Sequence, residues 1–145
     1  EGTNLNFLIC IQDGSGSGSD RMTIEDCHAI CPDAANTHWI NLAGTGDGHR
    51  IRRNVLMGDW GTMAIGGAGI VTNCEVTHNM IFNAASDNDS CINMGATATG
   101  ICAYNVAGGA AAQANGITTG DLAAAENYYS VHTEDLQAIL DPIVT

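Results

Sequence analysis

Acidic and basic side chains recur at matching positions of two short segments, and a histidine follows in a third. Glu25 and Asp26 belong to the first segment, Arg52 and Arg53 to the second, and His78 to the third. If these segments are stacked strands, their matching side chains lie ~5 Å apart. Such a surface patch could supply the acid and base of a catalytic site, with an arginine as the base of a lyase. We favour charge pairing on a solvated face, which stabilises by roughly a few tenths of a kcal/mol per pair.

Two groups of possible metal ligands are weak candidates. Asp87 and Asp89 resemble part of a calcium-binding loop, but the glycine and the distant glutamate of a full loop are missing. Cys27 and Cys31 lie on either side of His28, yet the second half of a zinc site is absent. We therefore predict no metal and no other cofactor.

The two tryptophans are candidates for a binding surface. Trp39 and Trp60 each lie beside a predicted strand. Their rings could stack on a glycan or contact another subunit. They could equally fill the core of the first coils.

The composition limits the partners that the chain can bind. It contains 16 acidic residues, four arginines and no lysine, which gives a formal net charge of −12. Such a chain repels the phosphates of nucleic acids, so nucleic-acid binding is not expected. No apolar run is long enough to predict a membrane span. The six cysteines permit disulfides, but their pairing stays open.

Two series of short segments alternate along the chain with a shared period of about 25 residues. Each member of the first series reads apolar-x-x-(Asn or Cys)-x-apolar. These members are 24–29, 51–56, 76–81, 102–107 and 124–129, and those of the second series are 9–11, 40–42, 63–65, 92–94 and 115–117. Apolar and polar residues alternate within them, which is typical of strands. Because no helical stretch separates the strands, the pattern favours a coil that stacks on itself.

One polar position recurs in register throughout the first series. It is occupied by Cys27, Asn54, Asn79, Asn105 and Asn127. Asparagine tolerates the left-handed conformation that a sharp corner between strands requires. Stacked asparagines can also form hydrogen bonds along the column. The sequence therefore predicts a structural amide ladder that is interrupted at Cys27.

The expected fold is all-β: a right-handed parallel β-helix solenoid of about five coils, forming a single domain over residues 1–145. A short helix over about 133–141 is expected to cap the C-terminal end, because Leu136, Ile139 and Leu140 form one apolar stripe. The N-terminal end shows no matching cap, and the first residue is Glu1 rather than Met. The domain could therefore be the C-terminal part of a longer chain.

The pattern at 51–56 and 76–81, with its weaker copies, resembles the right-handed parallel β-helix proteins of the pectate-lyase-like superfamily. The resemblance covers roughly residues 5–130 and implies a fold rather than one activity, since this architecture hosts unrelated functions. The tail, 125–129 with 133–142, is similar to the ends of β-helix proteins found on bacteriophage particles.

These observations predict a non-enzymatic structural protein of a virus (phage) particle surface or tail, or of another extracellular assembly. Its expected partners are further copies of itself, other particle proteins or a surface glycan. A polysaccharide hydrolase or lyase domain and a glycan-binding module are the alternatives. The arginine-rich motifs of polygalacturonases and pectate lyases are not recognisable, which disfavours the enzyme.

Overall fold

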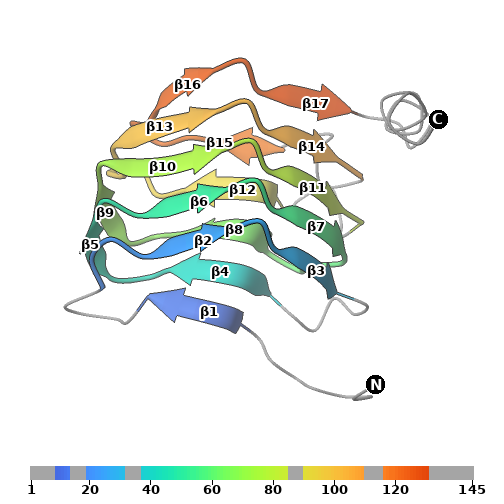
Figure 1. The fold of residues 1–145 in the computed structure, drawn as a ribbon, viewed down its shortest axis with the longest axis horizontal. Coiled ribbons are helices and arrows are strands. Elements are labelled where there is room, and N and C mark those ends of the chain that lie inside the picture. Colours follow the sequence, from blue (N-terminus) through green and yellow to red (C-terminus); the bar gives the residue numbers. More distant parts are fainter. Residues whose placement is uncertain (1–8, 14–18, 32–36, 85–89, 110–115, 131–145) are drawn as a thin grey trace.

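Figure 1 shows the computed structural model, which describes residues 9–13, 19–31, 37–84, 90–109 and 116–130. These residues form short β-strands that are joined by turns and bends, and they contain no helix. No helix in this part of the chain is therefore long and apolar enough to cross a membrane. The helix expected at 133–141 lies outside the described residues, and the single domain over 1–145 stays a prediction.

Three five-stranded parallel sheets form the walls of the molecule. Sheet A contains β1 (Ile9–Asp13), β4 (His38–Leu42), β8 (Met63–Gly67), β12 (Ser90–Met94) and β15 (Ile117–Thr118). Sheet B contains β2 (Thr23–Glu25), β6 (Arg50–Arg52), β10 (Cys74–Thr77), β13 (Gly100–Ala103) and β16 (Ala123–Ala125). Sheet C contains β3 (His28–Cys31), β7 (Val55–Gly58), β11 (Met80–Asn83), β14 (Val106–Gly108) and β17 (Tyr128–Ser130). A small two-stranded sheet consists of β5 (Thr45–Asp47) and β9 (Ile70–Thr72).

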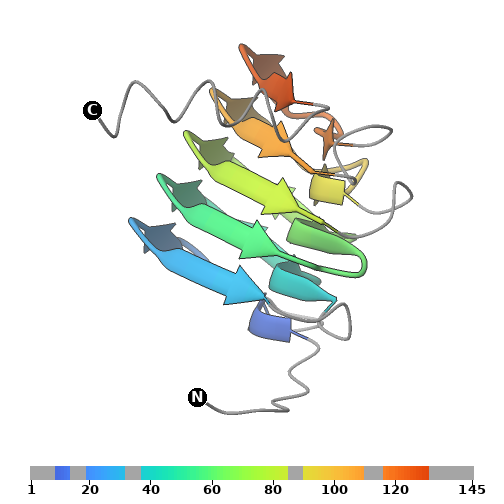
Figure 2. The ribbon, with the colours of Figure 1, turned by 90° about the vertical axis from the view of Figure 1, so that its right-hand side faces the viewer.

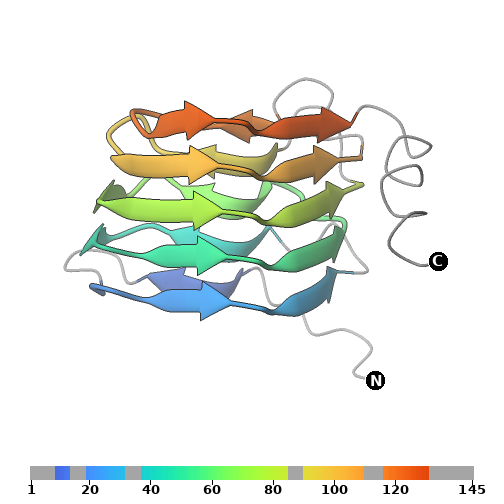
Figure 3. The same ribbon diagram turned by 45° about the horizontal axis from the view of Figure 1, so that its top comes forward.

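The chain passes through sheets A, B and C in turn and then begins the next coil (Figures 1 and 3). All strand pairs are parallel, and Ile51 faces Ile24 in the coil before it and Val76 in the coil after it. The predicted all-β parallel solenoid is therefore confirmed. The predicted number of about five coils is corrected to about three. These three coils, at 38–58, 63–83 and 90–108, each pair with described strands of the coil before and the coil after. The first and last rows have a neighbour on one side.

Sheet B shows how the alternation of the sequence produces the core. Alternate residues of each strand point inward, and one inward column runs through all five strands of the sheet. The inward column is at most 8% exposed in its first four rows, which contain Ile24, Ile51, Val76 and Cys102. Burial of this column against sheets A and C supplies much of the hydrophobic free energy that holds the coils together.

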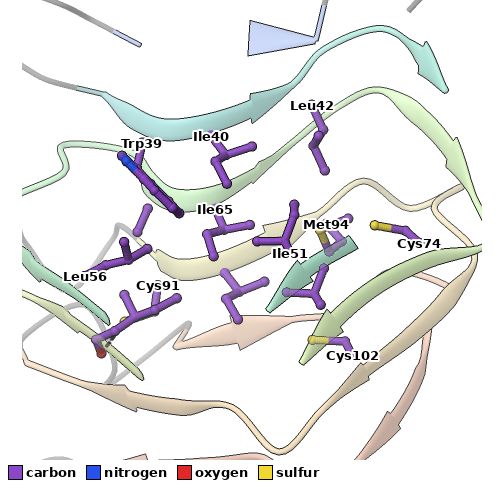
Figure 4. Close-up of a cluster of buried hydrophobic side chains, with 14 of the residues drawn as sticks. Trp39, Ile40, Leu42, Ile51, Leu56, Ile65, Cys74, Cys91, Met94 and Cys102 are labelled. Carbon is purple, nitrogen blue, oxygen red and sulfur yellow. Dashed lines mark hydrogen bonds between the residues drawn. The ribbon is translucent and has the colours of Figure 1, made fainter. Parts of the chain in front are cut away.

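Sheet A buries two adjacent side chains in successive strands, which simple alternation does not predict. In β12 the N–H groups of Cys91 and Ile92 both donate to the carbonyl of Gly116, at 3.0 Å each. Two residues then face one residue of the next strand, as in a β-bulge. Trp39 and Ile40 occupy the matching position in β4, and Figure 4 shows both side chains in the core.

Candidate functional site

The predicted amide ladder runs along the corner between sheets B and C. The Nδ2 group of Asn54 donates to Oδ1 of Asn79 at 2.9 Å, and Asn79 donates in the same way to Asn105 at 3.0 Å. Asn105 continues to Asn127 at 3.0 Å. Each of these acceptor oxygens also receives the backbone N–H of the asparagine before it. Because the first three asparagines are at most 1% exposed, the ladder satisfies polar groups that water cannot reach.

The left-handed residue of this corner is not the asparagine, which corrects the reason we gave for its recurrence. Positive φ angles of 45–58° occur one residue earlier, at Asp26, Arg53, His78, Tyr104 and Glu126. For a residue with a Cβ atom this conformation costs roughly 1–2 kcal/mol. The asparagine recurs because its amide pairs between coils. The residue before it turns the chain and holds its own side chain at the surface.

Cys27 begins the column without an amide, as its sequence position indicates. Its backbone N–H donates to Oδ1 of Asn54 at 3.0 Å, and its thiol donates to the carbonyl of Glu25 at 3.4 Å. The amide ladder therefore begins at Asn54.

The structure brings together the four predicted charges of the surface patch. Nε of Arg52 donates to Oε2 of Glu25 at 2.6 Å. Arg53 forms a two-pronged pair with Asp26, in which both N···O distances are 2.8 Å, and it also contacts Oε2 of Glu25 at 3.1 Å. The hydrogen bond from Arg52 lowers the pKa of Glu25, and the one from Arg53 lowers the pKa of Asp26. In return, Asp26 raises the pKa of Arg53.

Two further charged residues that the sequence interpretation missed extend the patch. Glu75 lies 3.7 Å from Arg50 and 3.8 Å from Arg52, and it accepts a hydrogen bond from the Thr77 hydroxyl at 3.1 Å. The strand register places Arg50 opposite Glu75. Their recurrence in the repeat could have revealed the pair, since both lie one residue before the inward column.

His78 belongs to a different contact from the four charges. Its ring stacks on Tyr104 in the next coil, with ring centroids 5.0 Å apart and an interplanar angle of 25°. Both residues occupy the left-handed position of the corner. The corner column thus holds a charge pair at Asp26 and Arg53 and an aromatic stack at His78 and Tyr104.

The geometry of the patch favours charge pairing over acid–base catalysis. Arg53 has a raised pKa and stays protonated, so it cannot accept a proton as the base of a lyase. Glu25 and Asp26 are both held ionised by arginines, so neither is suited to donate a proton at neutral pH. Since the patch is largely open to solvent, its pairs contribute little to stability.

Of the two roles that the sequence left open for Trp39 and Trp60, the structure supports filling of the core and not an exposed glycan or subunit contact. Trp39 is 6% exposed and Trp60 is 1% exposed. Trp39 precedes the buried Ile40 in β4, and Asn83 holds the backbone of Trp60 through the Trp60 N–H at 2.9 Å and the Trp60 carbonyl at 3.1 Å. Both rings therefore belong to the core.

The candidate metal ligands divide between described and undescribed residues. Asp87 and Asp89 lie outside the described residues. The thiol of Cys31 donates to the carbonyl of Asp59 at 3.1 Å, at the opposite end of β3 from Cys27. Within the described ranges, no group of three or more His, Cys, Asp or Glu side chains could hold a metal ion.

Five of the cysteines are free thiols, and all but the first are buried: Cys27, Cys31, Cys74, Cys91 and Cys102. Burial raises the pKa of Cys74, Cys91 and Cys102 to about 12. These thiols therefore stay protonated at neutral pH and are poor nucleophiles. They act as small apolar members of the core (Figure 4).

The outer surface of sheet C is an apolar face that the sequence interpretation did not single out. Its strands lie one above another in Figure 2. Inward residues such as Leu56 and Ile81 are at most 1% exposed, whereas Ile30 is 82%, Met57 50% and Tyr128 58% exposed. The apolar face consists of Ile30, Val55, Met57, Met80, Phe82, Val106 and Tyr128.

Comparison with protein-family models, with curated proteins and with solved structures finds no match to this chain.

Proposed function

We propose that this chain is a non-enzymatic structural solenoid that acts by assembling with copies of itself and with other proteins. Its setting would be the surface or tail of a virus (phage) particle or another extracellular assembly. The resemblance of its repeat to pectate-lyase-like β-helix proteins, and of its tail to β-helix proteins of phage particles, supports this setting.

The apolar face of sheet C is the observation that carries the proposal. Apart from His28, the outward residues of β3, β7, β11 and β14 are apolar or glycine, in a chain whose net charge is −12. Clustered exposed apolar side chains mark surfaces that another molecule covers. A flat sheet surface suits contact with another protein, because two such faces can pack ~10 Å apart with interdigitating side chains.

The mass of the chain in solution, measured by light scattering, tests the role of this face. We expect the wild-type chain to form an assembly of more than two chains. Replacing Ile30 and Met57 together with Glu places charge on the apolar face without entering the core, and should reduce the mass at least twofold. Ile70→Glu is the matched control, since Ile70 is 53% exposed but lies in β9, away from sheet C. Equal masses for the wild-type chain and the double variant would refute the proposal.

A glycan-binding module is a second candidate, now with different residues. Tyr104 is 42% exposed and Tyr128 is 58% exposed, so their rings, unlike those of the tryptophans, can reach a sugar. Replacing Tyr104, which lies outside the apolar face, with Ala should weaken binding to a glycan array while the assembled mass stays unchanged. This alternative is excluded if the wild-type chain binds no glycan and the substitution lowers the assembled mass.

A further inference from the structure

Met57 is the most exposed of the five methionines, all of which lie in the part of the chain that the structure describes. They occupy positions 22, 57, 63, 80 and 94. Met57 is 50% exposed, Met94 is 2% exposed within the core, and the other three are half-buried. A reagent in solution therefore reaches the side chain of Met57 more easily than that of any other methionine.

Met57 also lies within the apolar face of sheet C. The strand register places it between Ile30 of the coil before and Phe82 of the coil after. In its own strand, β7, Leu56 is buried in the core and Met57 lies on the outer side. Because Ile30 is 82% exposed, the surface beside Met57 is open as well. A partner that covered this face would therefore cover Met57.

The free thiols are less accessible to a reagent than Met57. Burial raises the pKa of three of them to about 12: Cys74, Cys91 and Cys102. The thiolate is the reactive form of cysteine, so these three react slowly at neutral pH. Cys31 is buried as well, and Cys27, which is half-buried, donates its thiol hydrogen to the carbonyl of Glu25 at 3.4 Å. Among these sulfur-containing side chains, Met57 is the most accessible target for an oxidant.

Hydrogen peroxide converts the thioether of methionine into a sulfoxide. A bond forms between Sδ and one peroxide oxygen as the O–O bond breaks, so the sulfur is oxidised by two electrons and the peroxide is reduced. The proton of the transferred oxygen passes to the departing hydroxide, which leaves as water. The product carries a polar oxygen that accepts hydrogen bonds, whereas the thioether packs as an apolar group. A dry contact that suits the thioether is therefore unfavourable for the sulfoxide, whose oxygen would lose its bonds to water.

We infer that Met57 is an oxidation site for peroxide that gates assembly through the apolar face of sheet C: the thioether permits the contact and the sulfoxide prevents it. The inference rests on the proposed function, because it requires that this face is covered in the assembly. The reaction takes place on dissociated chains, in which Met57 is open to solvent. Oxidation therefore acts before assembly and keeps the modified chains apart.

Assembly should in turn protect Met57 from oxidation. The side chain is covered while the apolar face is in contact with a partner, so peroxide reaches it only in dissociated chains. When about nine tenths of the chains are assembled, the oxidation of Met57 should be roughly tenfold slower than in dissociated chains. An exposed methionine without a role in assembly would be oxidised at the same rate at every protein concentration.

The test treats the full chain with hydrogen peroxide at a low protein concentration, where it is dissociated. Mass spectrometry of its peptides should show one added oxygen on Met57 before any on Met94. After removal of the peroxide, light scattering over a concentration series should show that the oxidised chain needs about tenfold more protein to reach the wild-type mass. A tenfold change corresponds to about 1.4 kcal/mol, which one polar group that loses its bonds to water can cost.

Met57→Leu is the matched control, because leucine has a similar volume and contains no sulfur to oxidise. It should assemble as the wild-type chain does and should keep its mass after the peroxide treatment. Met57→Gln places a polar amide at the same position and should reproduce the oxidised chain without any peroxide. Met63→Leu removes a half-buried methionine of sheet A, away from the apolar face, and should respond to peroxide as the wild-type chain does.

Circular dichroism shows whether the treated chains keep their fold; if peroxide unfolds the wild-type chain, the mass of Met57→Gln decides. Oxidation of Met57 that leaves the assembled mass unchanged would overturn the inference. Loss of mass in treated Met57→Leu would also overturn it, because the target would then be another residue, and so would oxidation of Met94 before Met57. These results leave the proposed function intact as long as the untreated wild-type chain is larger than the Ile30→Glu, Met57→Glu double variant. Equal masses for these two untreated chains would contradict the proposed function, and the inference with it.

Discussion

Replacing Asn79 with Ala tests whether the amide ladder stabilises the coils. Asn79 lies in the middle of the ladder and is 1% exposed. Its Oδ1 accepts the N–H of Asn54 at 3.1 Å and the Nδ2 group of Asn54 at 2.9 Å. Its own Nδ2 donates to the carbonyl of Ile51 at 2.9 Å and to Oδ1 of Asn105 at 3.0 Å. The substitution therefore removes four hydrogen bonds at a site that water does not reach.

The magnitude follows from the groups that lose their partners. Two donors of Asn54 become buried and unpaired, and each such group costs about 1–3 kcal/mol. We expect Asn79→Ala to lower the free energy of unfolding by about 4 kcal/mol, a large share of the roughly 5–15 kcal/mol of an ordinary domain. Asn127→Ala is the matched control. Asn127 is half-buried at the end of the ladder, where water can replace it, so its loss should cost only about 1 kcal/mol.

Urea unfolding followed by circular dichroism measures both variants. The difference between them matters more than either value, because it separates burial within the ladder from the chemistry of the amide. If Asn79→Ala costs no more than Asn127→Ala, the ladder does not hold the coils together and its recurrence needs another explanation.

Three further perturbations probe the glycines, the charges and the core. Gly66→Ala should lower the free energy of unfolding by about 2 kcal/mol or more, because φ is 146° and the new Cβ would lie 1.9 Å from a backbone oxygen of β12. Gly48→Ala is the control: φ is 72° and the nearest atom to its new Cβ is 3.5 Å away, so it should cost only about 1 kcal/mol. Equal thermal midpoints for the two variants would contradict this prediction. Arg53 lowers the pKa of Asp26 from 3.8, so the pair stabilises the fold above pH 3.8 and its contribution is lost as the pH falls further. The urea midpoint of Arg53→Ala should therefore decrease less steeply with falling pH than that of the wild-type chain. Equal slopes would show that the pair is not maintained in solution. Ile51→Asp should unfold the chain at neutral pH, since it buries an unpaired charge at a site with 0% exposure, and a native circular dichroism spectrum would refute the register of sheet B.

The sequence by itself determined the period, the parallel stacking and the pairing between coils. The recurring polar position brings each ladder asparagine beside the next, and it equally brings Glu25 beside Arg52 and Asp26 beside Arg53. This succeeds because a solenoid converts a separation of one period in the sequence into adjacency in space.

Only the tertiary structure decided which direction the side chains face. Trp39 and Ile40 are both buried in β4, although strict alternation of the strand would place one of them outside. The left-handed residue before each ladder position is set by how the chain turns between two sheets, and residue type alone does not reveal it. The sequence also did not predict the apolar face of sheet C. A row of apolar residues is normally assigned to the core, and only the structure shows that other residues fill the interior. The sequence pattern thus fixes which residues become neighbours, whereas the closure of three sheets around one core fixes which side of each neighbour meets water.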